Sequence, residues 1–184
     1  MAEIDYIGYV SKLSEMLNQT YESLDAHAAV VVLLRAVNHG FQVLLVKRAE
    51  NAVDPWSGQT ALPGGKGLSE DRNLMETVVR ETLEETGINL LMGCRFLGVM
   101  ESFRSTQKPE MKILPFVVFQ EKEQAIDLNE ELAEYFWAPL GEFAKNKVTV
   151  KFGVDEYPAF IIKNHVVWGL TFRILDKLLI LLYL

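Results

Sequence analysis

The sequence predicts an α/β fold in which a mixed β-sheet lies between helices. Three observations predict it: helical periodicity near both ends, two β-branched apolar runs around a glycine-containing turn, and further strand-like runs on either side of a central helix. We expect one domain over residues 1–184, because this length is close to the usual domain size and allows a substantial core.

The first third of the chain predicts a helix, a hairpin and a loop. Apolar side chains recur at steps of three or four over residues 4–24, which is typical of an amphipathic helix. Residues 27–37 and 41–49 are apolar runs around the sequence NHG, and we expect them to pair as a hairpin. Residues 49–60 hold Asn, Asp, Pro, Ser and Gly, so they predict a loop.

The rest of the chain alternates strand-like and helix-like segments. Residues 61–67 (ALPGGKG) predict a short strand that runs into a glycine-rich turn, and a helix over 73–86 should stop at Gly87. Further strands are expected at 94–103, 112–120, 135–140, 148–151 and 157–163, and further helices at 140–144 and 166–184.

Composition excludes several classes of protein. The chain has 18 Lys and Arg against 25 Asp and Glu, so its formal net charge is −7, which argues against broad nucleic-acid binding. Its 49% hydrophobic content argues against disorder, and one cysteine fits a reducing compartment such as the cytoplasm. We expect no signal peptide and no membrane span, because the apolar run over 178–184 is far shorter than the ~20 residues that a span needs. This C-terminal segment predicts a buried helix or an oligomer contact.

Three carboxylates carry the chemistry. On a helix, Glu81, Glu84 and Glu85 stand at i, i+3 and i+4 and share one face, where like charges repel. A divalent cation would reverse that repulsion, and hard carboxylate oxygens suit Mg²⁺ or Mn²⁺. The glycines at 64 and 65 let backbone N–H groups approach a ligand closely. An isolated ExxEE is usually a solvated helix face, but beside a glycine turn it suits an enzyme that binds a pyrophosphate through metal ions.

The segment over residues 65–88 resembles the signature of the Nudix hydrolase superfamily, Gx5Ex7REUxEExGU, in which U is aliphatic. The matching residues are Arg80, Glu81, Glu84, Glu85, Gly87 and Ile88. The chain departs from the signature at Asp71, which stands in place of Glu, in the eight residues between Asp71 and Arg80, and at Thr82, which stands at an aliphatic position. The resemblance implies a Nudix-type α/β/α sandwich with a mixed sheet and a Mg²⁺- or Mn²⁺-dependent pyrophosphohydrolase.

The spacing GG-x5-D-x8-RE is similar to the coenzyme A pyrophosphatase branch of that superfamily. The upstream residues 44–48 and 58–65 and the late residues 168–175 also resemble this branch. Against it, Leu68 replaces an expected Asp, and residues 54–57 replace a histidine-containing segment. For a coenzyme A substrate, the implied products are 3′,5′-ADP and 4′-phosphopantetheine.

The resemblance also implies roles for single residues. Glu81, Glu84 and Glu85 are the implied metal ligands, with Gly65 beside them, and Arg80 would orient the carboxylates. Glu131 is a candidate general base or extra ligand because it precedes a Trp-x-Pro-Leu-like strand, and Glu101 is a second candidate. Any single glutamate in this loop is also compatible with a solvated role.

Contacts to the substrate are expected from basic residues and from the glycine turn. The candidates are Arg48, Gly64, Gly65, Lys66 and Arg104. Lys66 fits an exposed position equally well, and a solvated role is the preferred interpretation for Arg104 and Lys108, which lie in one hairpin loop. Trp56 and Phe103 fit either base stacking or core packing, and Cys94 predicts a small core residue.

Two alternatives stay open at the level of sequence. The substrate of the same chemistry is coenzyme A, or else ADP-ribose, a dinucleotide or a nucleoside triphosphate. The second alternative is a non-catalytic nucleotide sensor, against which the intact glutamate triad argues. The expected partner in either case is a small nucleoside diphosphate derivative, and the apolar C-terminal segment makes a homodimer an expectation.

Overall fold

A mixed sheet forms the centre of the protein in the computed structural model, which describes residues 6–20, 25–37 and 40–183. Its strands are β1 (Ala28–Val37), β2 (Gly40–Arg48), β3 (Thr60–Ala61), β4 (Gly64–Lys66), β5 (Cys94–Val99), β6 (Phe103–Arg104), β7 (Lys112–Gln120) and β8 (Leu132–Pro139). The main path runs β3-β2-β1-β7-β5, while β4 pairs with β1, β6 with β7 and β8 with β2. The central pair β1–β7 is parallel, and the other pairs are antiparallel.

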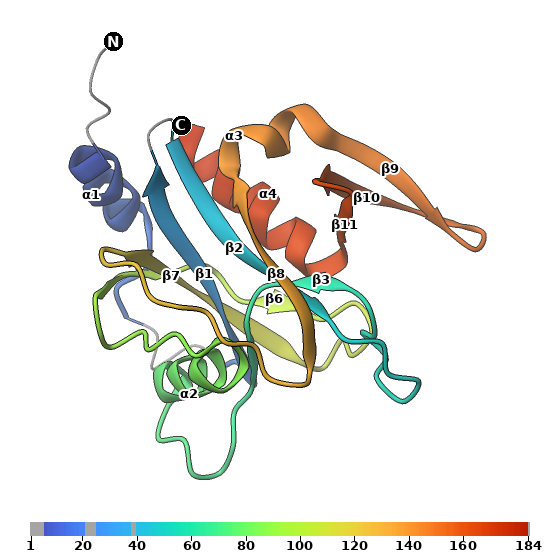
Figure 1. Cartoon of the computed structure of the whole chain (residues 1–184), viewed down its shortest axis with the longest axis horizontal. Coiled ribbons are helices and arrows are strands. Elements are labelled where there is room, and N and C mark those ends of the chain that lie inside the picture. The colour runs from blue at the N-terminus through green and yellow to red at the C-terminus, as the bar shows by residue number, and fades with distance from the viewer. Residues whose placement is uncertain (1–5, 21–24, 38–39, 184) are drawn as a thin grey trace.

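Helices cover both faces of this sheet (Figure 1). They are α1 (Tyr6–Met16), α2 (Leu74–Thr86), α3 (Leu140–Phe143) with a 3₁₀ turn at Ala144–Asn146, and α4 (Gly169–Tyr183). α2 lies on one face, and α1 and α4 lie on the other. The α/β/α sandwich with a mixed sheet is therefore confirmed. A second antiparallel sheet of β9 (Lys147–Phe152), β10 (Asp155–Ile162) and β11 (His165–Trp168), which the sequence did not predict as a separate unit, packs beside α4.

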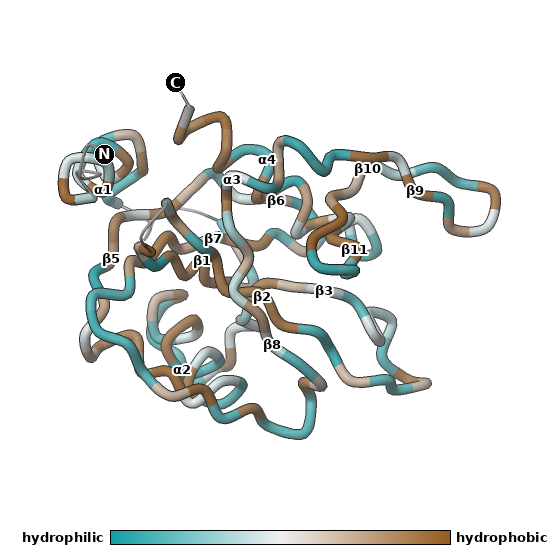
Figure 2. Tube along the Cα trace, turned by 45° about the horizontal axis from the view of Figure 1, so that its top comes forward, coloured by the Kyte–Doolittle hydropathy of each residue, from teal (hydrophilic) through white to brown (hydrophobic). Residues whose placement is uncertain are grey.

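The two faces of the sheet carry two hydrophobic cores. Val31 and Leu33 of β1 pack toward the α2 side with Val78, whereas Val32 and Leu34 pack toward the α1 and α4 side. Because a central parallel pair is buried on both faces, β1 is apolar almost without interruption rather than alternating. Figure 2 shows the same pattern as hydrophobic colour along β1 and β7.

The predicted helix over 4–24 is too long, because α1 ends at Met16. The chain next to it turns into an edge contact in which Asn18 exchanges two backbone hydrogen bonds with Val99 of β5, at 3.0 and 2.9 Å. Leu17 is buried although it lies outside the helix. The apolar spacing therefore predicts its burial correctly, but the predicted helical backbone at this residue is wrong. Residues 4–5 and 21–24 of the prediction, the hairpin turn at 38–39 and residue 184 lie outside the described residues.

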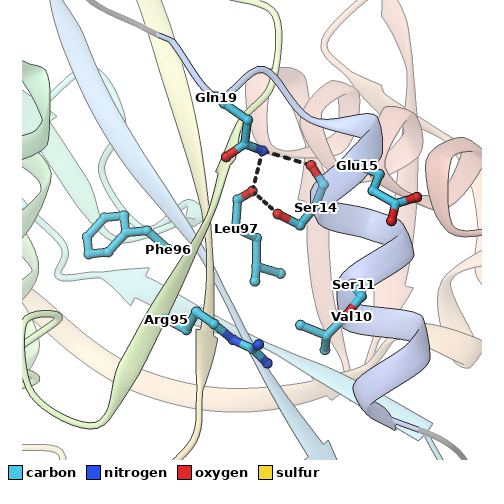
Figure 3. Close-up of a pocket in the computed structure, with 8 residues that line it drawn as sticks. All are labelled: Val10, Ser11, Ser14, Glu15, Gln19, Arg95, Phe96 and Leu97. Carbon is cyan, nitrogen blue, oxygen red and sulfur yellow. Dashed lines mark hydrogen bonds between the residues drawn. The ribbon is translucent and has the colours of Figure 1, made fainter.

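A hollow of about 360 Å³ lies between α1 and β5, away from the glycine segment (Figure 3). A β-bulge between Phe96 and Gly98 disturbs the ladder here, and the Leu97 carbonyl next to it accepts from Ser14 Oγ at 2.7 Å and Gln19 Nε2 at 2.9 Å. These polar groups therefore satisfy one another and tie α1 to the sheet.

The predicted C-terminal helix over 166–184 begins too early. Val166 and Val167 belong to β11, where they pair with β10, and α4 begins at Gly169, whose φ is +61°. β-branched residues favour strands, and glycine adopts this backbone conformation without steric cost. Leu175 and Leu178 of α4 are buried, as expected for a core helix, while an oligomer contact stays a prediction. In the part of the chain that the structure describes, no helix is both long enough and apolar enough to cross a membrane.

Candidate active site

The glycine segment is a short strand rather than the turn that the sequence predicts. β4 pairs antiparallel with β1, so that Gly64 lies opposite Val30 and Gly65 opposite Ala29. Gly64 has a φ of +139°, and a Cβ at this position would lie 2.3 Å from the Ala29 carbonyl oxygen. Only glycine allows this close approach, which brings the backbone of β4 under the helix that follows.

α2 is placed by caps at both of its ends. The Asn73 side chain accepts hydrogen bonds from the backbone N–H groups of Met75 and Glu76, and Gly87 ends the helix with a φ of 73°. Both boundaries confirm the helix predicted over 73–86. α2 packs against β1 and β4, so the residues on its inner face meet the glycine strand.

Glu85 is the buried member of the glutamate triad. The residue is 5% exposed, and its carboxylate accepts a 2.8 Å hydrogen bond from the Gly64 backbone N–H. The pKa of Glu85 is raised to about 7, mainly by burial and also by the nearby charges of Glu81 and Glu131, against the Gly64 hydrogen bond and Arg48, which lower it. A buried carboxylate between two others is an unfavourable arrangement unless a cation shares the site.

Glu81 lies against the second glycine, and Glu84 points toward solvent. A Cβ at Gly65 would lie 2.5 Å from the Glu81 carboxyl group, so this carboxylate occupies the space above the strand. The side chain of Glu84 is 56% exposed and accepts from Arg80 Nη1 at 3.2 Å. The three glutamates therefore do not share one environment. Glu81 and Glu85 lie at the glycine strand, whereas Glu84 lies at the exposed edge of the helix face.

Arg80 joins these carboxylates to the segment before α2. Its Nη1 donates to Glu81 at 2.9 Å as well as to Glu84, while Nη2 and Nε donate to the two oxygens of Asp71 at 2.9 and 3.1 Å. Asp71 also accepts from the Leu68 N–H and the Thr77 hydroxyl, and the Arg80 hydrogen bond holds its pKa far below the usual range. In the sequence Asp71 marks a departure from the signature and forms part of the spacing GG-x5-D-x8-RE, but its contact with Arg80 was not predicted.

The loop before β8 brings Glu131 to the same place. The backbone N–H groups of Asp127 and Asn129 donate to the Thr86 and Glu85 carbonyls at 2.9 and 3.2 Å, so the loop docks on the C-terminal end of α2. The Glu131 side chain is 62% exposed, and its Oε2 lies 3.9 Å from Arg48 Nη2. The structure thus brings this candidate beside the triad, whereas Glu101 pairs with Lys177 of α4 at 3.3 Å.

Arg48, at the end of β2, lies between two hollows. One, of about 260 Å³, extends from the glycine strand to the start of α4 and is mainly apolar. The other, of about 740 Å³, lies against the loop after β2 and includes Glu130 and Glu131. Arg48 Nε donates to Asp54 Oδ2 at 2.7 Å, and the Asp54 side chain is only 14% exposed. Asp54 was not a predicted site residue, because its pairing with Arg48 depends on how the loop folds.

The other predicted site residues are placed as follows. Lys66 lines the smaller hollow, whereas Arg104 Nη1 donates to the Pro109 carbonyl at 3.0 Å within its own loop. Trp56 lines the smaller hollow, and Phe103 packs against the core. Cys94 is half-buried, and burial raises the pKa of its thiol to about 11, as expected for an unreactive packing residue.

The donor set suits a hard divalent cation, although its side chains are not gathered around one point. Among the described residues, no group of three His, Cys, Asp or Glu side chains forms a ready metal site. Glu81 and Glu85 nevertheless present carboxylate oxygens beside the glycine strand, and burial raises the pKa of Glu85, which has no ion-pair partner within the described part of the chain. Oxygen donors with uncompensated negative charge are what Mg²⁺ and Mn²⁺ prefer.

Comparisons with known proteins agree with this geometry. The NUDIX domain family model matches residues 25–156. The chain is 30% identical over 168 residues to the mouse mitochondrial coenzyme A diphosphatase NUDT8, covering 87% of this chain and 80% of that protein. It is 26% identical over 177 residues to the uncharacterised Nudix hydrolase NudL of Pectobacterium atrosepticum, covering 92% of this chain and 91% of NudL.

A further relative and a solved structure complete the comparison. An uncharacterised protein of Schizosaccharomyces pombe is 32% identical over 132 residues, which are 65% of this chain and 40% of that protein. The crystal structure of a MutT/nudix family protein from Enterococcus faecalis shares the fold, with a TM-score of 0.54 and 20% identity over 95% of this chain and 67% of that one. With the family model spanning more than half of the sequence, the chain belongs to the Nudix hydrolase family of enzymes.

Proposed function

We propose that this enzyme hydrolyses the pyrophosphate bond of a nucleoside diphosphate derivative with the help of Mg²⁺ or Mn²⁺, and that coenzyme A or a derivative of it is the substrate. The observation that carries the proposal is the placement of Glu81 and Glu85 against Gly65 and Gly64. The branch-like spacing of the motif supports the substrate, as does the similarity to mouse NUDT8 and Caenorhabditis elegans ndx-8, which are both coenzyme A diphosphatases.

In this proposal Glu81, Glu84 and Glu85 hold the cation. Arg80 orients Glu81 and Glu84 through hydrogen bonds from its Nη1. A divalent cation bound there would polarise the phosphoryl oxygens and lower the pKa of an attacking water. Arg80 is itself fixed by Asp71, so the orientation of the carboxylates is set before any ligand arrives.

The remaining polar groups line the two hollows beside the glycine strand. Arg48 lines both hollows and offers guanidinium N–H groups to phosphate oxygens, and Lys66 adds a second positive charge at the glycine strand. Glu131, beside Arg48 and exposed to the larger hollow, is the proposed general base or additional ligand. A pyrophosphate at the glycine strand would then direct one half of the substrate into each hollow.

A substrate panel tests the proposal. Coenzyme A, ADP-ribose, diadenosine polyphosphates and nucleoside triphosphates are assayed with Mg²⁺ and with Mn²⁺, and the products are separated by chromatography. We expect 3′,5′-ADP and 4′-phosphopantetheine from coenzyme A as the fastest reaction. A faster reaction with another panel member reassigns the substrate, and ligand binding without turnover would favour a nucleotide sensor.

Two variants test the assignment of the residues. Glu84→Gln and Glu85→Gln should each lower kcat by at least about a hundredfold, because a lost ligand removes transition-state stabilisation. Glu142→Gln, at an exposed position on α3, is the matched control and should keep full activity. Full metal-dependent turnover in Glu85→Gln would contradict the mechanism.

The cytoplasm stays the predicted compartment, and the homodimer also stays a prediction.

A further inference from the structure

Hydrogen bonds hold the loop after β2 in place beside the smaller hollow. Asp54 Oδ1 accepts the Trp56 backbone N–H at 3.0 Å while Oδ2 accepts Arg48 Nε at 2.7 Å. The Pro55 carbonyl accepts Gln107 Nε2 at 3.3 Å, from the loop between β6 and β7. Trp56 is half-buried and lines the hollow, so these contacts fix one aromatic wall.

A second wall comes from the β6–β7 loop through Ser105, Thr106 and Gln107, and the next residue of this loop is Lys108. Its backbone is set by hydrogen bonds of Lys108 N to Ser105 Oγ at 3.2 Å and of Met111 N to the Lys108 carbonyl at 2.8 Å. The Lys108 ammonium lies over the Trp56 ring, 5.2 Å from its centroid. No carboxylate of the described residues lies within ion-pair distance of this ammonium, although the protein carries a net charge of −7.

The hollow between these walls suits a planar base. Its apolar side includes Trp56, Met111 and Ile113, and amide groups are available from Gln59 and Gln107. Aromatic faces stack on nucleobases, and amide side chains pair with the donor and acceptor edges of adenine. One end of the hollow is formed by Gly64 and Gly65, where the pyrophosphate is proposed to lie.

The Lys108 ammonium has a half-buried aromatic ring as its neighbour and no carboxylate within ion-pair distance among the described residues, so an anion would bind it favourably. We propose that Lys108, presented by Trp56, is a specificity-determining residue that binds a phosphate on the ribose of an adenine nucleotide seated in the smaller hollow. Coenzyme A carries such a phosphate at the 3′ position, and dephospho-coenzyme A lacks it. The inference rests on the proposed function for the choice of substrate, but the binding site itself is open to an independent test.

The first experiment measures binding of two nucleotides by calorimetry. Wild-type protein should bind 3′,5′-ADP about tenfold more tightly than 5′-AMP, and Lys108→Ala should abolish this preference without weakening 5′-AMP binding. Lys122→Ala is the matched control, since it removes the same charge beyond the opposite end of β7, and it should keep the preference. Lys108→Arg keeps the positive charge, so it should keep most of the preference for 3′,5′-ADP that Lys108→Ala loses.

The second experiment measures turnover of coenzyme A and dephospho-coenzyme A. We expect KM for coenzyme A to rise about tenfold in Lys108→Ala with little change in kcat, and neither value to change for dephospho-coenzyme A. Equal effects on both substrates, or no nucleotide preference in the wild type, would overturn the inference even if coenzyme A is hydrolysed. A Lys108-dependent preference for 3′,5′-ADP in an enzyme that turns over neither substrate would support the inference and overturn the proposed function.

Discussion

Arg80 donates hydrogen bonds to both oxygens of Asp71, with Nε 3.1 Å from Oδ1 and Nη2 2.9 Å from Oδ2. This two-point contact fixes the plane of the guanidinium, and its remaining nitrogen reaches Glu81 and Glu84. Asp71 thus controls two carboxylates of the proposed metal site without contacting either of them.

Asp71→Asn should therefore lower both stability and activity. We expect a loss of about 2 kcal/mol in the free energy of unfolding, because a nearly buried charge-assisted hydrogen-bond pair is removed. The Arg80 contact lowers the pKa of Asp71 in the folded state, so its contribution is complete above the ordinary carboxyl pKa and is lost as the pH falls below about 4. Urea unfolding at pH 7 and at pH 3 should show the difference between wild type and variant shrinking on acidification.

The control for this experiment is the exposed pair Arg72–Glu76. Arg72 is 85% exposed, and an exposed ion pair of this kind is worth little. Arg72→Gln should leave the free energy of unfolding nearly unchanged at either pH. If Asp71→Asn were equally mild, the control of the carboxylates by Asp71 would be refuted.

Glu85→Gln should stabilise the metal-free protein at neutral pH. The folded-state pKa of Glu85 is raised to about 7, so ionising this carboxyl destabilises the fold progressively between about pH 4.5 and 7, and fully above that. The linked loss in the wild type is up to about 3 kcal/mol, and glutamine avoids it while keeping an oxygen for the Gly64 N–H. Chemical unfolding in a chelator at pH 5 and pH 7.5 measures this difference. Glu84→Gln, at an exposed position, should show none of it, and parallel pH profiles for wild type and Glu85→Gln would disprove the idea.

Elements with local causes could be predicted from the sequence. α2 has its own start signal at Asn73 and its own stop at Gly87, and both boundaries agree with the prediction. The β1–β2 hairpin likewise follows from two adjacent apolar runs. The three glutamates were singled out because their spacing alone places them on one helix face.

What the sequence did not reveal depends on contacts between distant segments. Asn18 leaves the helical pattern because Val99, far along the chain, offers an edge partner. Asp54 and Arg48 are six residues apart, but their pairing exists only once the loop is folded over the sheet. The split of the triad, with Glu85 buried and Glu84 exposed, follows from how α2 docks on β4, which periodicity cannot specify.

Thr82→Val should stabilise the protein. The Thr82 hydroxyl is fully buried and has no hydrogen-bond partner among the described residues, at a position where the resembled signature has an aliphatic side chain. Valine has nearly the same shape without the unsatisfied polar group, so we expect a gain of about 1 kcal/mol and unchanged turnover. Urea unfolding and the coenzyme A assay measure the two quantities.

Thr86→Val is the matched comparison on the same helix face. The Thr86 hydroxyl donates to the Thr82 carbonyl at 2.7 Å and accepts the Ile88 N–H at 3.3 Å. Removing it should cost about 1 kcal/mol, the opposite sign from Thr82→Val. A loss of stability in both variants would mean that the Thr82 hydroxyl has a partner in solution.

Gly64→Ala and Gly65→Ala should separate folding from catalysis. At Gly64 the new methyl group would meet the Ala29 backbone at 2.3 Å, and the φ of +139° adds strain, so we expect a loss of about 2 kcal/mol or more. At Gly65 the atoms nearest to the methyl group would be those of the Glu81 carboxyl group, the far end of a flexible side chain, so the fold should survive with Glu81 displaced. Thermal unfolding and kcat should then show Gly64→Ala as unstable, and Gly65→Ala as folded but at least about a hundredfold slower.

Gly141→Ala, which has open space around it, controls for the added methyl group. A fully active Gly65→Ala would show that the position of Glu81 above the glycine strand is not needed for turnover.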